Sequence, residues 1–313
     1  MAPLPTATSR VHGLFGHPYL DLEPLIDTSG FADLDDELSL GLARAPTAPT
    51  GGSLKWMGVV APWAMEDGHV DYGHAIEAFD DAEWLRFVSL ADEPSRFDVR
   101  ERASIRFGDE TDNPLSEAQW RWLQFRHRVY FPWKHGYHLL ENDRWEDKHS
   151  GDGKAFPEEA ERLFPRTLAF VKSLPFTEIG RAVIFGVAEH DHAPAHRDTE
   201  PGAEAIAQSI SFDPRGDKRF YVCGDGGEPL HVVESRIYWF NDMDWHGVLP
   251  DPFFRYSVRV DGVFDRDFAR ALRRLAGRLE RHPASPAFRP AFTSFSSPSR
   301  RASTSAFISS TFS

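Results

Sequence analysis

Six short stretches decide the fold of this chain: RAVIFGVA (181–188), AIAQSISF (205–212), KRFYVC (218–223), LHVVE (230–234), RIYWFN (236–241) and YSVRVDGVF (256–264). They are rich in β-branched and aromatic residues, and turn clusters such as DPRGDK (213–218) and GDGGEP (224–229) interrupt them. No helical pattern separates one stretch from the next. Closely spaced strands of this kind predict an antiparallel sandwich or barrel rather than a parallel sheet with crossover helices.

Around this core, which we place at 181–283, helices are expected on both sides. Residues 266–281 put Phe268, Leu272, Leu275 and Leu279 on one side of a helix that closes the folded part. Residues 54–180 predict a mixed, partly helical region that packs on the core. In it, Ser116 and Gln119 have the spacing of a capping box, and Pro165 either starts or kinks a helix.

The two ends differ from the middle in composition. Residues 1–53 mix Pro, Thr, Gly and Ala, most densely in ARAPTAPTGGS (43–53), and contain one acidic amphipathic stretch. This predicts a flexible N-terminal arm. Residues 284–313 hold ten Ser, three Thr and three Arg and no acidic residue, so we expect a disordered Ser-rich tail.

Composition and charge exclude several classes of protein. The 313 residues carry 35 Lys and Arg against 48 Asp and Glu, a net charge of −13, which is the wrong sign for a protein that coats nucleic acid. The single cysteine, Cys223, excludes an intramolecular disulfide and a thiolate zinc cluster. No apolar run reaches the length of a membrane span, and MAPLPTATSR (1–10) lacks the pattern of a secretory signal. We therefore expect a cytoplasmic protein that binds neither nucleic acid nor membrane.

Potential metal ligands concentrate in EHDHAPAHRDTEPG (189–202). His196 and Asp198 stand two residues apart, and in an extended segment such residues point to the same side. His246 follows 48 residues after Asp198, at the end of the strand-like run RIYWFNDMDWHGV (236–248). Two His and one carboxylate that leave the other positions open form the arrangement typical of non-haem Fe(II) oxygenases. His190 and His192 form a competing HxH pair, which we interpret instead as part of a loop.

A basic strand face follows the last of these candidate ligands. In RYSVRVDGVF (255–264), Arg255, Ser257 and Arg259 share one face. Because an unpaired buried charge costs several kcal/mol or more, such a face predicts an anion nearby. The guanidinium of Arg255 suits a carboxylate, with the Ser257 hydroxyl as a second donor. Arg259 is either an ion-paired residue at the sheet edge or a substrate contact.

The ordered series HRD (196–198), KRFYVCG (218–224), RIYWFNDMDWHGV (236–248) and RYSVRVDG (255–262) resembles the iron- and 2-oxoglutarate-dependent dioxygenases. More narrowly, it resembles their aspartyl/asparaginyl β-hydroxylase-like branch. The resemblance covers about 181–264 and implies a mostly β protein with a double-stranded β-helix (jelly-roll, cupin-like) core flanked by helices.

The resemblance also implies the roles of individual residues. Fe(II) would be held by His196, Asp198 and His246. The cosubstrate 2-oxoglutarate would chelate this iron and be anchored by Arg255 with help from Ser257. A second basic group would come from Arg219, with Arg181 as the alternative. The animal peptide hydroxylases of the branch lack the ligand carboxylate, so the presence of Asp198 means that their substrate cannot simply be transferred. Asp198 also argues against halogenation.

The implied activity is hydroxylation, with O₂, of an unactivated carbon in an amino acid that is free, peptidyl or carrier-bound. Asp or Asn is the first candidate, and 2-oxoglutarate would be decarboxylated to succinate. Two other classes stay open: a metal cupin enzyme that does not use 2-oxoglutarate, and a non-catalytic binding scaffold. Residues 126–149, with Arg126, Arg128, Trp133, Lys134 and His135, are either a helix end with a partly buried loop or a substrate wall.

Overall fold

The computed structural model describes most of the chain, namely residues 11–45, 47–48, 54–57, 72–96, 115–127, 133–141, 147–198, 207–224 and 227–281. The predicted Ser-rich tail, 284–313, lies outside the described residues. So do 1–10 and 49–53 of the predicted arm.

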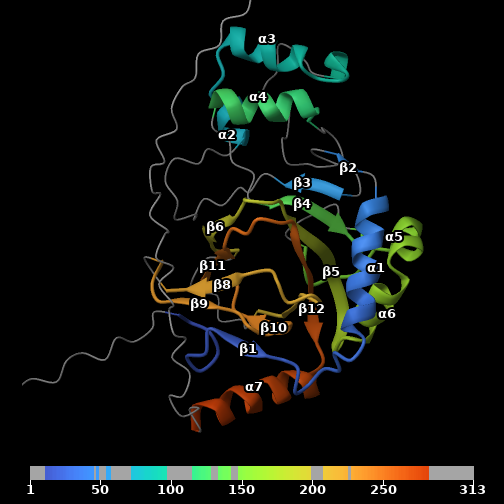
Figure 1. The fold of residues 1–313 in the computed structure, drawn as a ribbon, viewed down its shortest axis with the longest axis vertical. Helices are drawn as coiled ribbons and strands as arrows, with labels where there is room; N and C mark the ends of the chain where they lie inside the picture. The colour runs from blue at the N-terminus through green and yellow to red at the C-terminus, as the bar shows by residue number, and fades with distance from the viewer. Residues whose placement is uncertain are drawn as a thin grey trace, which may run out of the picture.

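Two β-sheets form the centre of the molecule (Figure 1). The larger sheet has the order β1-β10-β7-β12-β5-β4-β3-β2, and the smaller has the order β6-β11-β8-β9. The strands are β1 (Tyr19–Asp21), β2 (Thr47–Ala48), β3 (Leu54–Met57), β4 (Trp133–His138), β5 (Phe176–Val187), β6 (Ala193–His196), β7 (Ser209–Phe212), β8 (Phe220–Cys223), β9 (Leu230–Val232), β10 (Ile237–Phe240), β11 (Trp245–Val248) and β12 (Arg255–Phe264).

The last eight strands follow the path of a double-stranded β-helix. Counted from β5 as the first, they lie in the order 6-3-8-1 in the larger sheet and 2-7-4-5 in the smaller one. All their pairings are antiparallel, and Val187, Phe240, Phe220 and Val248 from the two sheets pack together in one cluster. This strand order is that of a jelly roll, which confirms the predicted fold.

The alternation of side chains along β12 separates the hydrophobic core from the interior between the sheets. Tyr256, Val258 and Val260 belong to the large hydrophobic cluster on the outer face of the larger sheet. Successive side chains of a strand point to opposite faces, so Arg255, Ser257 and Arg259 face the interior between the sheets. The period-two pattern read from the sequence therefore has a structural basis.

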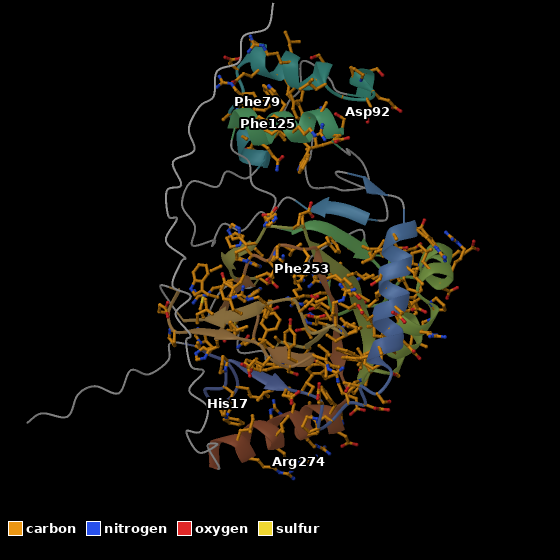
Figure 2. All side chains as sticks on the ribbon, viewed as in Figure 1. His17, Phe79, Asp92, Phe125, Phe253 and Arg274 are labelled. Carbon is orange, nitrogen blue, oxygen red and sulfur yellow. The ribbon has the colours of Figure 1, made fainter. Side chains whose placement is uncertain are left out.

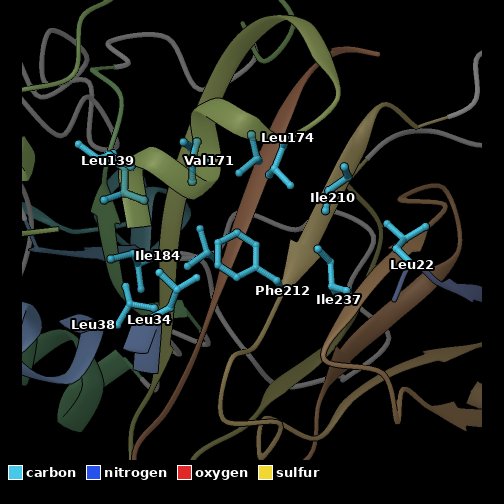
Figure 3. Packing of buried hydrophobic residues seen from close by; sticks show 14 of the residues in the cluster. Leu22, Leu34, Leu38, Leu139, Val171, Leu174, Ile184, Ile210, Phe212 and Ile237 are labelled. Atoms are coloured by element: carbon cyan, nitrogen blue, oxygen red, sulfur yellow. The ribbon is translucent and has the colours of Figure 1, made fainter. Parts of the chain in front are cut away.

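Three helices cover that outer face: α1 (Phe31–Arg44), α5 (Glu158–Leu163) and α6 (Pro165–Ser173). Figure 3 shows how Leu34 and Leu38 of α1 and Val171 of α6 meet residues of the sheet, among them Ile184. Gly41 allows close packing, because a Cβ there would lie 2.2 Å from the ring of Phe164. Of the two predicted alternatives, Pro165 starts a new helix, α6, rather than kinking a longer one.

The prediction of a flexible arm over 1–53 is wrong for residues 11–45. β1 pairs with β10 in antiparallel register, and α1 packs on the sheet. Leu20, Leu22, Phe31 and Leu38 are at most 1% exposed. Burying these apolar side chains offsets the entropy of ordering the segment. The densest run of Pro, Thr and Gly, at 43–53, begins only where α1 ends.

A second group of helices has its own small hydrophobic cluster. The group consists of α2 (Tyr72–Glu77), α3 (Asp81–Ser89) and α4 (Glu117–His127), and the short 3₁₀ helix η1 (Pro94–Arg96) lies between α3 and α4 in the chain. Phe79, which is buried, and Phe125, which is 80% exposed, mark this group in Figure 2. The predicted capping box is confirmed. Ser116 N–H donates to Gln119 Oε1 at 3.0 Å, and Gln119 N–H donates to Ser116 Oγ at 3.1 Å.

The closing helix α7 (Arg266–Arg281) packs through Phe268, Leu272 and Ala276. Leu279 was predicted on the packed side but is 41% exposed, because the contact with the core ends before the last turn. Among the described residues, no helix has the length and apolar character needed to cross a bilayer.

Candidate metal centre

The strand pairing of the smaller sheet brings the two predicted His ligands together. His196 ends β6, and His246 lies in the neighbouring strand β11 as its direct partner in the antiparallel register. Oδ1 of Asp198, two residues after β6 ends, lies 3.6 Å from Nε2 of each imidazole. One donor atom from each of the three residues falls within 4.8 Å of the others. The structure thus brings together the three residues that the sequence predicted to be ligands.

Both imidazole rings are oriented by the same kind of hydrogen bond to the backbone. Nδ1 of His196 lies 2.7 Å from the carbonyl oxygen of Pro194, and Nδ1 of His246 lies 2.8 Å from that of Asp244. Each Nδ1–H therefore donates to the carbonyl two residues earlier, which turns Nε2 toward Asp198. Burial lowers the pKa of His196 to about 3, so its ring is neutral, as a metal ligand must be.

The donor set fits a divalent ion. His246 is fully buried, and its Nε2 has no hydrogen-bond partner among the described residues. A buried polar atom with no partner is costly unless a ligand satisfies it. The Asp198 side chain is 26% exposed, so the site opens to solvent on that side. Two imidazoles and one carboxylate suit Fe(II), Mn(II) or Co(II) and leave positions for other ligands.

Asp198 is ionised because of a buried cation that the sequence left unassigned. Arg259 Nη1 lies 2.5 Å from Asp198 Oδ2. Burial by itself raises the pKa of Asp198, but Arg259 and His246 outweigh it and hold that pKa well below its usual range. Arg259 is 6% exposed, so it is a buried ion-paired residue rather than one at an exposed sheet edge.

Two further carboxylates surround Arg259. Asp242 Oδ2 and Asp261 Oδ1 each lie 3.0 Å from its Nη2. Lys148 in turn contacts Asp242 at 2.6 Å, and Arg181 contacts Asp261 at 2.8 Å. Apart from the inward face of β12, no sequence pattern predicts this network, because Asp242 lies in a turn where an acidic residue is ordinary.

Arg255 lies on the predicted face of β12, but its guanidinium is already hydrogen-bonded to backbone carbonyl oxygens. Its side chain is fully buried, and Nη1 donates to the carbonyl oxygens of Asp251 and Phe253 at 3.1 and 2.8 Å. Nη2 donates to the carbonyl oxygens of Asp191 and Leu249 at 2.9 and 3.3 Å. Nε has no hydrogen-bond partner among the described residues, although it lies 3.9 Å from Asp251 Oδ2. The role of Arg255 as a carboxylate clamp therefore stays a prediction.

The basic residue beside Ser257 is Lys218, which was not among the predicted site residues. Lys218 Nζ donates to Ser257 Oγ at 2.7 Å and to the carbonyl oxygen of Phe185 at 3.1 Å. No carboxylate of the described residues lies within ion-pair distance of it. Burial lowers its pKa from 10.5 to about 7. A buried ammonium of this kind is suited to an anionic ligand.

Arg219, the predicted second basic group, is not part of this site. Its side chain is 52% exposed, and Nη1 contacts the carbonyl oxygen of Pro250 at 3.3 Å and Asp251 Oδ1 at 3.8 Å. Neighbouring residues of an extended segment point to opposite sides, so Lys218 faces inward and Arg219 outward. The structure therefore places Lys218, and not Arg219, beside Ser257.

The other candidates lie apart from the donors. His190 and His192 join no group of potential metal ligands in the described part of the chain. Of residues 126–149, α4 ends at His127 and Trp133–His138 form β4 of the larger sheet, where a loop was expected. Arg128 and the side chains of Trp133, Lys134 and His135 lie outside the description, so the substrate wall stays a prediction.

Comparison with known proteins adds little to this geometry. No family model matches the sequence, and no curated protein matches it. Among solved structures, the chain is similar to an oxidoreductase of the 2OG-Fe(II) oxygenase family from Burkholderia pseudomallei, at 13% identity and a TM-score of 0.27, covering 41% of this chain and 66% of that chain.

Two hydroxylases are similar to a comparable degree. A prolyl-4-hydroxylase from Pseudomonas putida shows 14% identity and a TM-score of 0.24, over 41% of this chain and 70% of that chain. A prolyl hydroxylase from Trichoplax adhaerens, solved with a hypoxia inducible factor peptide fragment, shows 11% identity and a TM-score of 0.27, over 48% and 71%. The chain spans just under two thirds of the first structure. The fold assignment therefore rests on the strand order, and the candidate site rests on the convergence of His196, Asp198 and His246.

Proposed function

We propose that this chain is an Fe(II)- and 2-oxoglutarate-dependent oxygenase that hydroxylates an unactivated C–H bond. The observation that carries the proposal is the convergence of His196, Asp198 and His246 at the end of the smaller sheet of a double-stranded β-helix. Three protein donors leave three positions of an octahedral ion for other ligands. Two would take the cosubstrate and one would take O₂.

The chemistry that bound iron supplies is activation of O₂, with 2-oxoglutarate oxidised to succinate and CO₂ while one oxygen atom enters succinate and the other the product hydroxyl. The chain holds and orients the reactants. His196 and His246 present Nε2 because their Nδ1–H groups are engaged by backbone carbonyls. Phe240 and Phe220 pack against the His246 ring, at 4.9 and 5.6 Å between centroids, and shield it from water.

For the distal carboxylate of 2-oxoglutarate, Lys218 and Ser257 form the anchor that the geometry favours. Ser257 lies two residues from Arg259 on the same face of β12, or about 7 Å along the strand. Because Arg259 contacts Asp198, a small dicarboxylate bound to an ion at Asp198 would extend toward Ser257. Arg255 lies about 7 Å farther along, and its bonds to Asp251 and Phe253 direct it away from Arg259.

As the substrate we propose an amino acid that is free, within a peptide or attached to a carrier, with Asp or Asn as the first candidate. This choice is supported by the ordered motifs at 196–198, 218–224, 236–248 and 255–262 and by their resemblance to the aspartyl/asparaginyl β-hydroxylase-like branch.

The test is a turnover assay with Fe(II), O₂ and labelled 2-oxoglutarate, comparing the wild type with His196→Ala and Lys218→Met. Succinate release that needs His196 and rises with an Asp or Asn peptide is the expected result. A wild type that binds metal but not 2-oxoglutarate would instead identify a metal cupin enzyme. A wild type that binds no Fe(II), Mn(II) or Co(II) would leave only the binding scaffold.

A further inference from the structure

Every nitrogen of the Arg259 guanidinium has a carboxylate partner. Nε donates to Asp261 Oδ1 at 3.1 Å, Nη2 donates to Asp242 Oδ2 at 3.0 Å, and Nη1 donates to Asp198 Oδ2 at 2.5 Å. The planar group also lies over the Phe240 ring, 5.4 Å from its centroid. A guanidinium fixed on its edges and on one face cannot turn away from Asp198 without breaking several contacts at once.

The partners of Arg259 do not depend equally on it. Asp242 keeps Lys148 at 2.6 Å, and Asp261 keeps Arg181 at 2.8 Å. Among the described residues, Arg259 is the only lysine or arginine within ion-pair distance of Asp198. Loss of the guanidinium would therefore leave Asp198 with no lysine or arginine partner in the described part of the chain, whereas Asp242 and Asp261 would each keep one.

The two oxygens of Asp198 have different surroundings. Oδ1 lies 3.6 Å from Nε2 of both His196 and His246, whereas Oδ2 is bonded to Arg259. The Asp198 backbone is also fixed, because its N–H donates to the carbonyl oxygen of Asp242 at 3.0 Å. The carboxylate is thus held at its backbone and at one oxygen, and the other oxygen faces the imidazoles.

We propose that Arg259 is a positioning residue that occupies Oδ2 of Asp198 and so restricts this ligand to one metal bond, through Oδ1. A carboxylate that bound through both oxygens would take a fourth position on the ion. The proposed function needs three free positions, two for 2-oxoglutarate and one for O₂, and in this respect the inference rests on it. Arg259 would keep those positions free without touching the ion.

The alternative is that Arg259 only stabilises the fold through its ion pairs. Arg181 is the matched control, because it is also buried, at 4% side-chain exposure against 7% for Arg259, and also pairs with Asp261. Its ion pair with Asp261 does not involve Asp198. A purely structural role predicts the same behaviour for Arg259→Met and Arg181→Met.

The experiment titrates the wild type, Arg259→Met and Arg181→Met with Co(II) and records the ligand-field absorption, first without and then with 2-oxoglutarate. For Arg259→Met we expect a changed Co(II) spectrum from the added carboxylate oxygen. Its Co(II) affinity should equal or exceed that of the wild type, because a positive charge near the ion is gone. Its 2-oxoglutarate affinity should fall about tenfold or more, the usual size of such indirect effects at metal sites. Arg181→Met should match the wild type in the Co(II) spectrum and in Co(II) affinity.

Two further variants separate geometry from charge and from misfolding. Arg259→Lys keeps the charge but cannot bridge three carboxylates, so it should also change the Co(II) spectrum. In an Asp198→Ala background, Arg259→Met should have no further effect on Co(II) binding, because the residue through which Arg259 acts is gone.

An Arg259→Met protein with an unchanged Co(II) spectrum would overturn the inference. So would losses of metal and cosubstrate affinity that merely follow thermal stability, as in Arg181→Met. A wild type that binds Co(II) but not 2-oxoglutarate would refute the proposed function alone, since the spectra without cosubstrate still test Arg259.

Discussion

Replacing Lys218 with methionine should stabilise the ligand-free protein near neutral pH and remove a pH dependence of its stability. Burial lowers the pKa of Lys218 from 10.5 to about 7, while nearby Asp213 raises it and Arg255 lowers it. Between these two pH values the unfolded chain holds a proton on this lysine that the folded chain does not. The free energy of unfolding therefore rises with pH across this range, and below about pH 7 the full cost of burying the charge remains.

The size of the effect follows from the fall in pKa. One bound proton changes the free energy of unfolding by about 1.4 kcal/mol per pH unit. Between about pH 7 and pH 9, the wild type should gain roughly 3 kcal/mol relative to Lys218→Met. The variant also loses the hydrogen bonds to Ser257 and to the carbonyl oxygen of Phe185, at a cost of about 1–3 kcal/mol at every pH. The difference between the two proteins should thus reverse in sign as the pH rises.

The same lysine makes cosubstrate binding depend on pH in the opposite sense. A carboxylate beside the ammonium favours the protonated form, so the bound pKa exceeds the free one. Above about pH 7 the affinity for 2-oxoglutarate should fall by up to about tenfold per pH unit, and this slope should vanish in Lys218→Met. Urea titrations and calorimetry at several pH values measure both effects. A flat difference in stability between the two proteins would refute the burial argument, and a pH-independent affinity would refute Lys218 as the anchor.

Other substitutions test the supports of the site. Gly247→Ala should lower Co(II) affinity about tenfold, because its Cβ would lie 2.5 Å from the Ala193 carbonyl oxygen and push β6 and β11 apart beside a metal ligand; unchanged affinity in a titration would contradict this. Arg255→Met should cost about 3 kcal/mol or more in denaturant unfolding, since four backbone carbonyls lose their donor; a variant that loses only 2-oxoglutarate binding would restore Arg255 as the clamp. Asp244→Ala should speed hydrogen exchange at Gly13, whose N–H it accepts at 2.7 Å; unchanged protection would show that another contact holds this segment.

The sequence contained enough information to predict the fold and the convergence of His196, Asp198 and His246, because both depend on local patterns. Period-two alternation marks β12, and the inward polar residues stand out against Val258 and Val260. The HxD spacing places Asp198 beside His196 even though β6 ends at His196 and the chain bends at Asp198. His246 could be added because it ends a strong strand pattern. Each of these signals lies within a few residues of chain.

What escaped prediction depends on contacts between distant residues. Lys218 ends the turn cluster DPRGDK, which in sequence is typical of an exposed loop. In the structure, Asp213 accepts the N–H groups of Gly216 and Lys218 at 2.9 and 2.7 Å, and this folds the turn so that the lysine enters the interior. Lys148 and Asp242 are separated by 94 residues, so no local pattern could pair them.

The charges around the donors bear on which ligand completes the site. The network of ion pairs around the donors contributes no net charge, because it joins three cations and three carboxylates. Its members are Arg181, Arg259, Lys148, Asp198, Asp242 and Asp261. A divalent ion at His196 and His246, which are both buried, would therefore keep both of its charges uncompensated, which is unfavourable. A ligand that binds the ion through a carboxylate would offset one of these charges, whereas a neutral substrate would offset neither. The balance therefore favours an anionic cosubstrate over a cupin reaction on a neutral molecule, and a proton on Lys218 would balance a second, distal carboxylate.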